Sequence, residues 1–228
     1  YLATKRLAQE AKRARIPKFV FASSCSVYYT TTAKSQKKFA EGDKVNPRAP
    51  YSLSKRMAEE ALLKLADKNF SVVILRAGTV FGFSKRMRYD LVVNTMVKDA
   101  LSKKTILVAA RGEQWRPLVA VGDLVKTYLT ILAAPEYLTS GQIFNVAVEN
   151  YKVRDIARLV QKGMNGETKI KTSQIQRYFK DRSYKVSTEK LKAVLGIRPA
   201  ISIEDSARDI VRNIKKFGYD NFDYPKYY

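Results

Sequence analysis

Histidine is absent from this 228-residue sequence, and cysteine occurs once, as Cys25. The lack of histidine excludes Ser-His-Asp hydrolysis, imidazole general bases and histidine metal sites. A lone cysteine excludes an internal disulfide and a cysteine-rich zinc site, and it is typical of a reducing compartment. We therefore expect no metal centre, and the chemistry has to come from hydroxyl, phenol, amine and carboxylate groups.

Long apolar runs and acidic residues are also scarce. No apolar run approaches the roughly 20 residues of a membrane span, and no signal peptide precedes Tyr1, which predicts a cytoplasmic protein without a membrane partner. Lys and Arg number 43 against 21 Asp and Glu, for a formal net charge of +22. The basic residues are spread along the chain without a nucleic-acid-binding motif. This favours a solvated basic surface over a nucleic acid partner.

The apolar patterns predict an α/β fold. Helical composition covers residues 4–14 and 51–68, and β-rich apolar runs cover residues 18–22 and 70–76. This strand–helix–strand order is typical of a crossover unit in a parallel sheet. Further along, the patterns predict helices at 91–101, 123–134, 153–164, from 187 to Gly196 and at 203–217, and strands at 106–109, 118–121 and 142–148.

Three chemically suited residues follow from this reading. Ser24 lies at the end of the first buried strand, where ligands gather in open α/β sheets. Tyr51 and Lys55 are four residues apart, so they share one face of the predicted helix. A hydroxyl, a phenol and an ammonium are the groups needed to move a proton off a sugar alcohol while a hydride leaves the same carbon.

These residues belong to a longer set of motifs. The motifs are residues 23–28 (SSCSVY), 50–55 (PYSLSK), 75–82 (LRAGTVFG), 87–94 (MRYDLVVN), 114–123 (QWRPLVAVGD) and 144–146 (FNV). With them the chain resembles, over nearly its whole length, the extended short-chain dehydrogenases/reductases, specifically the NAD-dependent epimerase/dehydratase family that acts on nucleotide sugars.

The resemblance implies a fold and a division of the chain. Residues 1–82 would form the C-terminal half of an NAD-binding Rossmann domain, a partial, doubly wound parallel sheet. Residues 83–228 would form a smaller α/β substrate-binding region, with elements that return to the main sheet. The family's glycine-rich phosphate-binding turn does not occur in the sequence, so we expect an N-terminally truncated member that is inactive by itself.

The resemblance also implies roles for particular residues. Tyr51 would be the acid/base at the sugar hydroxyl, Lys55 would bond the nicotinamide ribose and lower the pKa of the phenol, and Ser24 would bond the same sugar hydroxyl. Contacts to NAD, with NADP not excluded, would come from Ser23, Tyr51, Lys55, Ala77 and Thr79. Contacts to a nucleoside-diphosphate sugar would come from Ser24, Asn94, Arg116 and Arg182.

Several positions depart from the family pattern. Cys25 and Ser26 stand where the sugar 4,6-dehydratases carry an Asp-Glu pair, which argues against dehydration. Tyr29 replaces a usual glycine and Ala120 a common histidine. Asp123 matches the family, and we expect it to cap the helix that follows.

The leading functional prediction is therefore an NAD-dependent nucleotide-sugar epimerase. One alternative is an NAD(P)-dependent reductase or dehydrogenase of the same family. Another is a catalytically degenerate basic binding protein, which would bind polyanions in a salt-dependent way. The resemblance further implies a homodimer of the full-length protein, formed through the helix at 51–68 and residues near 1–14.

Overall fold

The computed structural model describes residues 1–28, 37–166, 168–173, 183–222 and 224. Its helices are α1 (Leu2–Arg13), α2 (Pro50–Leu63), α3 (Val92–Lys103), α4 (Val121–Ala133), α5 (Glu136–Thr139), α6 (Val153–Gly163), α7 (Glu189–Leu195) and α8 (Ile203–Phe217), with the 3-10 turns η1 (Cys25–Val27) and η2 (Ala110–Gly112). Its strands are β1 (Lys18–Ser24), β2 (Lys38–Phe39), β3 (Ser71–Ala77), β4 (Thr79–Phe81), β5 (Thr105–Ala109), β6 (Trp115–Ala120), β7 (Gln142–Val146), β8 (Glu149–Lys152), β9 (Lys169–Ser173) and β10 (Lys185–Val186).

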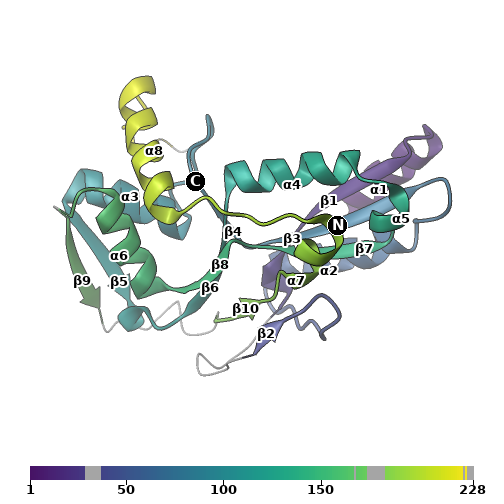
Figure 1. The fold of residues 1–228 in the computed structure, drawn as a ribbon, viewed down its shortest axis with the longest axis horizontal. Helices are drawn as coiled ribbons and strands as arrows, with labels where there is room; N and C mark the ends of the chain where they lie inside the picture. Colours follow the sequence, from purple (N-terminus) through teal and green to yellow (C-terminus); the bar gives the residue numbers. More distant parts are fainter. Residues whose placement is uncertain (29–36, 167, 174–182, 223, 225–228) are drawn as a thin grey trace.

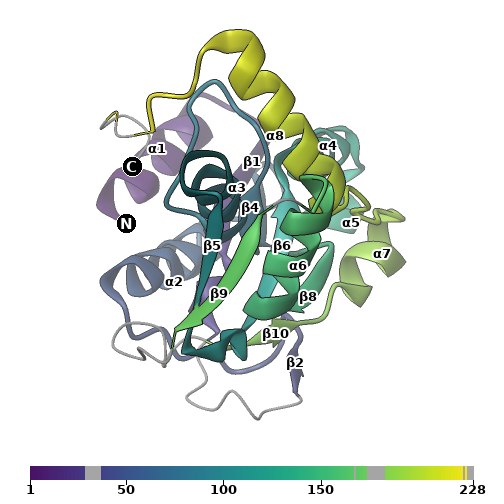
Figure 2. The same cartoon turned by 90° about the vertical axis from the view of Figure 1, so that its left-hand side faces the viewer.

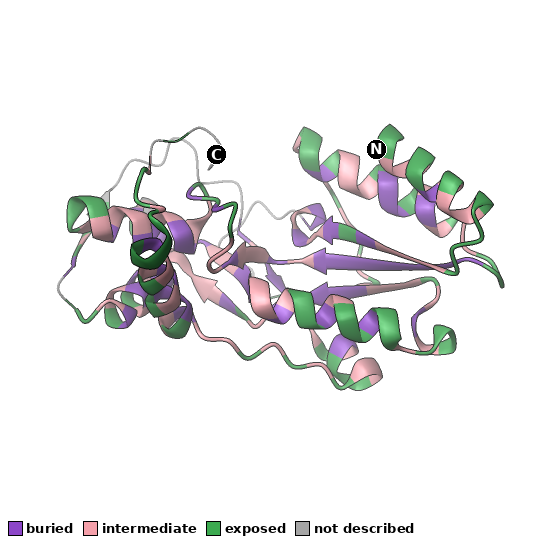
Figure 3. Cartoon of the chain, turned by 90° about the horizontal axis from the view of Figure 1, so that it is seen from above, coloured by how far each residue is buried: buried purple, intermediate pink, exposed green. Residues whose placement is uncertain are grey.

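The main sheet is parallel, in the order β1-β3-β7 within the described part of the chain. Side chains alternate across it, so Phe21 and Ile74 pack against α1 and α2, while Leu75 and Phe144 pack on the face that carries α4 and α7. The central strand β3 is buried over nearly its whole length, as a strand covered by helices on both faces should be (Figure 3). This α/β architecture confirms the predicted fold class.

A second group of elements lies beyond the carboxyl ends of these strands. Strands β4, β6 and β8 form one sheet and β5 pairs with β9, and helices α3, α6 and α8 pack against them around a separate apolar core (Figures 1 and 2). The arrowheads of the main sheet point toward this group (Figure 3). The strand ends therefore face the junction between the two groups of elements.

Most predicted elements are present, with shifted ends. The helix predicted at 51–68 ends at Leu63, because Asp67 accepts a hydrogen bond from the Asn69 backbone N–H and forms a local turn. The strand predicted at 118–121 begins earlier, at Trp115, because this residue pairs with Lys152 of β8. No helix of the described residues is long and apolar enough to cross a membrane.

The prediction that Asp123 caps α4 is wrong. Asp123 lies inside the first turn of that helix, and its carboxylate accepts hydrogen bonds at 2.8 Å from the backbone N–H groups of Ala200 and Ile201. The side chain thus fixes the segment before α8 to the start of α4. The local sequence favoured an Asp123 that caps its own helix, but the N–H donors come from a segment 77 residues away.

Gly78 should be the glycine least tolerant of substitution near the strand ends. A Cβ atom at this position would lie 2.7 Å from the Pro117 carbonyl oxygen, and that backbone cannot rotate away. We expect Gly78→Ala to lower the free energy of unfolding by about 1–3 kcal/mol in urea titrations. Gly42→Ala is the matched control, because nothing lies within 4 Å of the added Cβ. Equal stabilities for the two variants would contradict the close approach of β3 and β6.

Candidate active site

The carboxyl end of β1 carries the first predicted residue. Ser24 is half-buried, and its hydroxyl caps η1 by accepting a hydrogen bond from the Ser26 N–H at 3.2 Å. Ser26 in turn lies 3.2 Å, oxygen to oxygen, from the Ser52 hydroxyl on α2. These contacts connect the strand end to the first turn of α2. The serines of the SSCS motif therefore shape the turn that presents Ser24.

Helix α2 begins at this strand end. Pro50 occupies its first position, where a missing N–H costs nothing, and Tyr51 follows with its ring 58% exposed. The Lys55 ammonium donates a hydrogen bond to the Ala22 carbonyl at 2.7 Å and lies 5.6 Å from the centroid of the Tyr51 ring. The three residues of the predicted catalytic set thus come from β1 and the first turns of α2.

Burial and charge distinguish the groups at this end of the sheet. Burial lowers the pKa of the Lys55 ammonium, which lies 4.9 Å from the centroid of the Phe21 ring. Burial also raises the pKa of the Cys25 thiol well above its usual range, partly opposed by the positive charge of Arg76. The Cys25 thiol donates to the Arg76 carbonyl oxygen at 3.0 Å, so it acts as a structural group beside Ser24.

A buried ion pair lies one turn beyond Lys55. Glu59 and Arg76 are 0% and 1% exposed, and they form a bidentate pair with distances of 2.9 Å from Nε to Oε1 and 2.7 Å from Nη2 to Oε2. Burial opposes the charge of Arg76, but Glu59 outweighs this effect and raises the pKa of the guanidinium. The sequence reading missed this pair, although an arginine that ends the apolar run of β3 is an available signal.

The predicted cofactor contacts lie along the same strand ends. The Ser23 hydroxyl is buried and donates to Glu59 at 2.6 Å. Ala77 ends β3 in register with Ser24, and Thr79 begins β4 two residues later. Both are half-buried. Their roles toward a cofactor stay predictions, as do those of Tyr51 and Lys55.

The predicted substrate residues are more widely spread. Asn94 is buried on α3, where its side chain accepts from the Gly82 N–H and donates to the Arg88 carbonyl, both at 3.1 Å. Arg116 is half-buried on β6, with Nη1 2.9 Å from the Trp115 carbonyl. Arg182 lies outside the described residues. In this structure, Asn94 holds the turn after β4.

Arg88 is a residue near the site that the sequence reading did not single out. Its guanidinium pairs with Asp90, with Nε 2.7 Å and Nη2 2.6 Å from the two carboxylate oxygens. This pair raises the pKa of Arg88, and the negative charge that Tyr51 can carry adds a smaller effect in the same direction. The loop after β4 therefore brings a positive charge toward the exposed Tyr51 phenol.

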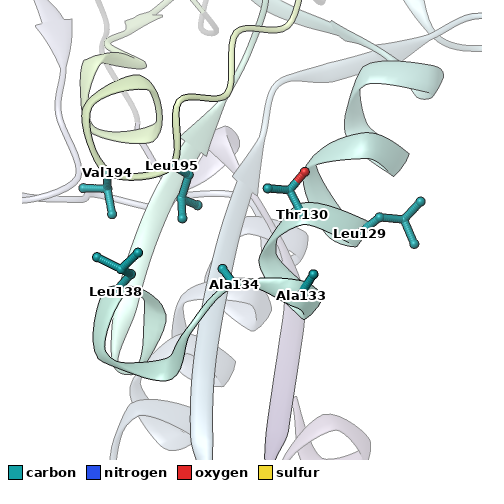
Figure 4. Close-up of a pocket in the computed structure, with 7 residues that line it drawn as sticks. All are labelled: Leu129, Thr130, Ala133, Ala134, Leu138, Val194 and Leu195. Atoms are coloured by element: carbon teal, nitrogen blue, oxygen red, sulfur yellow. The ribbon is translucent and has the colours of Figure 1, made fainter.

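An open apolar groove lies away from these strand ends. Its volume is about 580 Å³, and it is lined by side chains of α4, α5 and α7, namely Leu129, Thr130, Ala133, Ala134, Leu138, Val194 and Leu195 (Figure 4). It is apolar and lies toward the amino ends of the main sheet, where Lys18 donates to the Ala134 carbonyl. It contains no titratable group for catalysis. Among the described residues, no cluster of three Cys, Asp or Glu side chains is placed to hold a metal ion.

The carboxyl ends of β1 and β3 form the edge at which ligands bind in open α/β sheets. Residues 1–147 match the model of the NAD dependent epimerase/dehydratase family, and the chain belongs to this family. The chain is 30% identical over 162 residues to an uncharacterised UDP-glucose epimerase, YtcB, of Bacillus subtilis (strain 168), covering 70% of this chain and 48% of that protein. It is 26% identical over 216 residues to human dTDP-D-glucose 4,6-dehydratase, covering 91% of this chain and 59% of that protein.

The fold is also that of solved structures. The crystal structure of UDP-glucuronic acid 4-epimerase from Bacillus cereus in complex with UDP-glucuronic acid and NAD superposes with a TM-score of 0.77 at 23% identity, covering 94% of this chain and 67% of that one. This likeness shows a Rossmann-type fold. The chain spans about half of the Bacillus subtilis relative and about three-fifths of the human one.

Cys25 should report on the integrity of this strand end. Because the thiol is fully buried and its pKa is raised, the native protein should react with a thiol reagent at least about 100-fold more slowly than the unfolded chain. Labelling followed by mass spectrometry, with and without urea, measures both rates. Comparable rates in the two conditions would mean that β1 and η1 do not pack as described.

Proposed function

We propose that the protein is an NAD-dependent nucleotide-sugar epimerase, which oxidises a sugar carbon transiently and reduces it again on the other face. The observation that carries the proposal is the position of the Lys55 ammonium, bonded to the Ala22 carbonyl at 2.7 Å and 5.6 Å from the centroid of the Tyr51 ring, on a helix that contacts the turn after Ser24. Support comes from the family and from relatives whose names specify nucleotide-sugar epimerases.

In this proposal the proton moves between the sugar hydroxyl and Tyr51. The Ser24 hydroxyl and the Tyr51 phenolate bond the sugar hydroxyl, and the phenolate takes its proton as the carbon loses a hydride. The Lys55 ammonium, near the Tyr51 ring, stabilises the negative charge of that phenolate. When a hydride is returned to the carbonyl carbon, Tyr51 gives the proton back to the oxygen, and the two together would restore the alcohol.

The residues present fit the nicotinamide end of NAD. An ammonium has three N–H donors, and the Ala22 carbonyl accepts one of them, so Lys55 is suited to bond a ribose hydroxyl as well. Ser23, Ala77 and Thr79 line the adjoining strand ends. The sequence holds no Gly-x-x-Gly-x-x-Gly turn for the pyrophosphate, so the fit is limited to this end. Nicotinamide, when bound, supplies hydride acceptance and return.

Substrate recognition is assigned to residues 83–228. Arg116 on β6 and Asn94 on α3 come from this region, as does Arg182, and a guanidinium is suited to the diphosphate of a nucleoside-diphosphate sugar. Residues 1–82 form the nucleotide-binding side of the site. Helix α4 and strand β7 belong to the later region, but α4 packs on the main sheet and β7 pairs with β3. The two regions therefore share the main sheet.

Tyr51→Phe should abolish turnover in the full-length gene product. Loss of the phenolic proton donor and acceptor is expected to lower kcat by about 10²–10⁴-fold without changing the fold. Tyr137→Phe is the matched control, since Tyr137 is 84% exposed on α5. The assay follows UDP-sugars and dTDP-sugars by NMR. Activity of Tyr51→Phe within a few-fold of the parent would rule out the assigned role.

The same assay separates the epimerase from a net reductase or dehydrogenase. An epimerase yields a stereoisomer with no net change in NADH, and its cofactor stays bound through purification. A reductase or dehydrogenase changes the concentration of NADH or NADPH in step with product. Loss of water from the sugar would instead indicate dehydration.

We also expect a homodimer. Helices α1 and α2 pack together and leave large apolar side chains exposed, namely Leu2, Leu7, Leu53 and Met57. Pairing of these helices with a second copy would cover such side chains. Sedimentation equilibrium of the full-length protein should give twice the monomer mass, and Leu7→Glu with Leu53→Glu should give the monomer. A parent that sediments as a monomer at high concentration would contradict this.

A further inference from the structure

We propose that Glu59 and Arg76 are positioning residues, which hold the helix of Tyr51 and Lys55 at the working distance from Ser24. The proposal rests on the proposed function for its catalytic consequence. Its structural core is a buried ion pair that joins α2 to the strand ends beneath it. Neither residue is proposed to touch substrate or cofactor.

The sheet provides a polar row directly before the catalytic end. Ser23, Arg76 and Asn145 are neighbours in register across β1, β3 and β7. Residues in register on parallel strands point to the same face, and this is the face that α1 and α2 cover. Two residues earlier the same row consists of Phe21 and Ile74, which are core. On this face, apolar contacts therefore hold the middle of the strands, and hydrogen bonds hold their carboxyl ends.

Helix α2 is attached to the end of β1 at two successive turns. Lys55 donates to the Ala22 carbonyl, and Glu59 accepts from the Ser23 hydroxyl at 2.6 Å. Tyr51, Lys55 and Glu59 are spaced by four residues, so all three lie along one face of the helix. An apolar contact allows a helix to slide or rotate slightly, whereas a bidentate carboxylate–guanidinium pair fixes direction as well as distance.

Arg76 also fixes the segment that leads into α2. Its Nη1 donates to the Tyr28 hydroxyl at 2.6 Å and lies 3.3 Å from the Glu41 carbonyl. The Tyr28 hydroxyl lies 3.0 Å from the Asn145 side-chain oxygen, and burial raises the pKa of Tyr28 to about 12. The backbone N–H of Asn145 donates to the Glu41 carboxylate at 2.8 Å. One guanidinium thus connects β3 to the helix and to the chain before it.

Stability alone does not require a charged pair at this place. An apolar pair of similar volume in a buried site is often as stable as the ion pair, because the ions lose their hydration. The surroundings are already apolar, with Ala58 and Leu62 on the neighbouring helix positions. What an apolar pair cannot reproduce is the fixed orientation, and catalytic groups need to be held within a fraction of an ångström.

The test uses the double variant Glu59→Leu/Arg76→Met in the full-length gene product. We expect the double variant to fold with a lower melting temperature, because the buried Ser23 hydroxyl loses its acceptor, while the KM for the nucleotide sugar stays within about three-fold and kcat falls by at least about 10-fold. The control Glu10→Leu/Arg13→Met removes an exposed pair on α1 and should leave kcat unchanged. A folded double variant with kcat within two-fold of the parent would overturn the proposal.

A second readout is independent of activity. Hydrogen exchange of the peptide covering the first turns of α2 should be at least about 10-fold faster in the double variant, while the β3 and β7 peptides keep their protection. If the double variant does not fold, Glu59→Gln is judged by the same criteria. If Tyr51→Phe is inactive and the double variant is fully active, the positioning role of Glu59 and Arg76 is refuted and the proposed function stands. If Tyr51→Phe is active, the proposed function is refuted, and the hydrogen-exchange result decides whether Glu59 and Arg76 position the helix.

Discussion

The parallel register of β1 and β3 is the constraint on which the rest of the site depends. It sets Ser23 opposite Arg76 and Ser24 opposite Ala77, so the ends of two buried strands finish together. Because the strands are parallel, the chain has to cross over the sheet between them, and α2 makes that crossover. The helix that carries Tyr51 and Lys55 therefore starts at the same edge where Ser24 ends. The contact between the Ser26 and Ser52 hydroxyls and the hydrogen bond from Lys55 to the Ala22 carbonyl then attach this helix to the end of β1.

Register decides proximity, and buried polar groups decide orientation. Just before the strand ends, the side chains on this face are the polar Ser23, Arg76 and Asn145 in place of apolar ones. Glu59 of α2 bonds both Ser23 and Arg76. Such groups are costly to bury unless every one is hydrogen-bonded. Here the hydrogen bonds of Glu59 join α2 to both β1 and β3. The guanidinium of Arg76 bonds Tyr28 after η1, the Glu41 carbonyl and Glu59 of α2. On this face of the sheet, apolar packing thus holds the helices against the strands, and hydrogen bonds near the strand ends fix the orientation of α2.

Much of this arrangement could be predicted from the sequence. The apolar runs of β1 and β3 and the periodicity of α2 and α8 gave the elements, because local patterns report burial directly. The four-residue spacing of Tyr51 and Lys55 predicted that both lie on one face of a helix. Asp123 and the end of α2 were mispredicted because their partners, Ala200 in one case and a local turn at Asp67 in the other, compete with the simplest local choice. Arg76 and Glu59 were missed because a charge in an apolar run has no visible partner until the chain is folded.

The sequence by itself determined most of the helices, the strands of the main sheet, the family and the three groups predicted to move a proton, because these depend on residue type and short spacings. Only the tertiary structure decided which polar side chains are used internally. Asn94 bonds the backbone of its own loop, Asp123 reaches the segment before α8, and Arg76 of β3 pairs with Glu59 of the helix α2 that covers it. Those choices depend on distances between residues far apart in the chain. They are set by strand register and by the need to satisfy every buried polar group, which no local pattern contains.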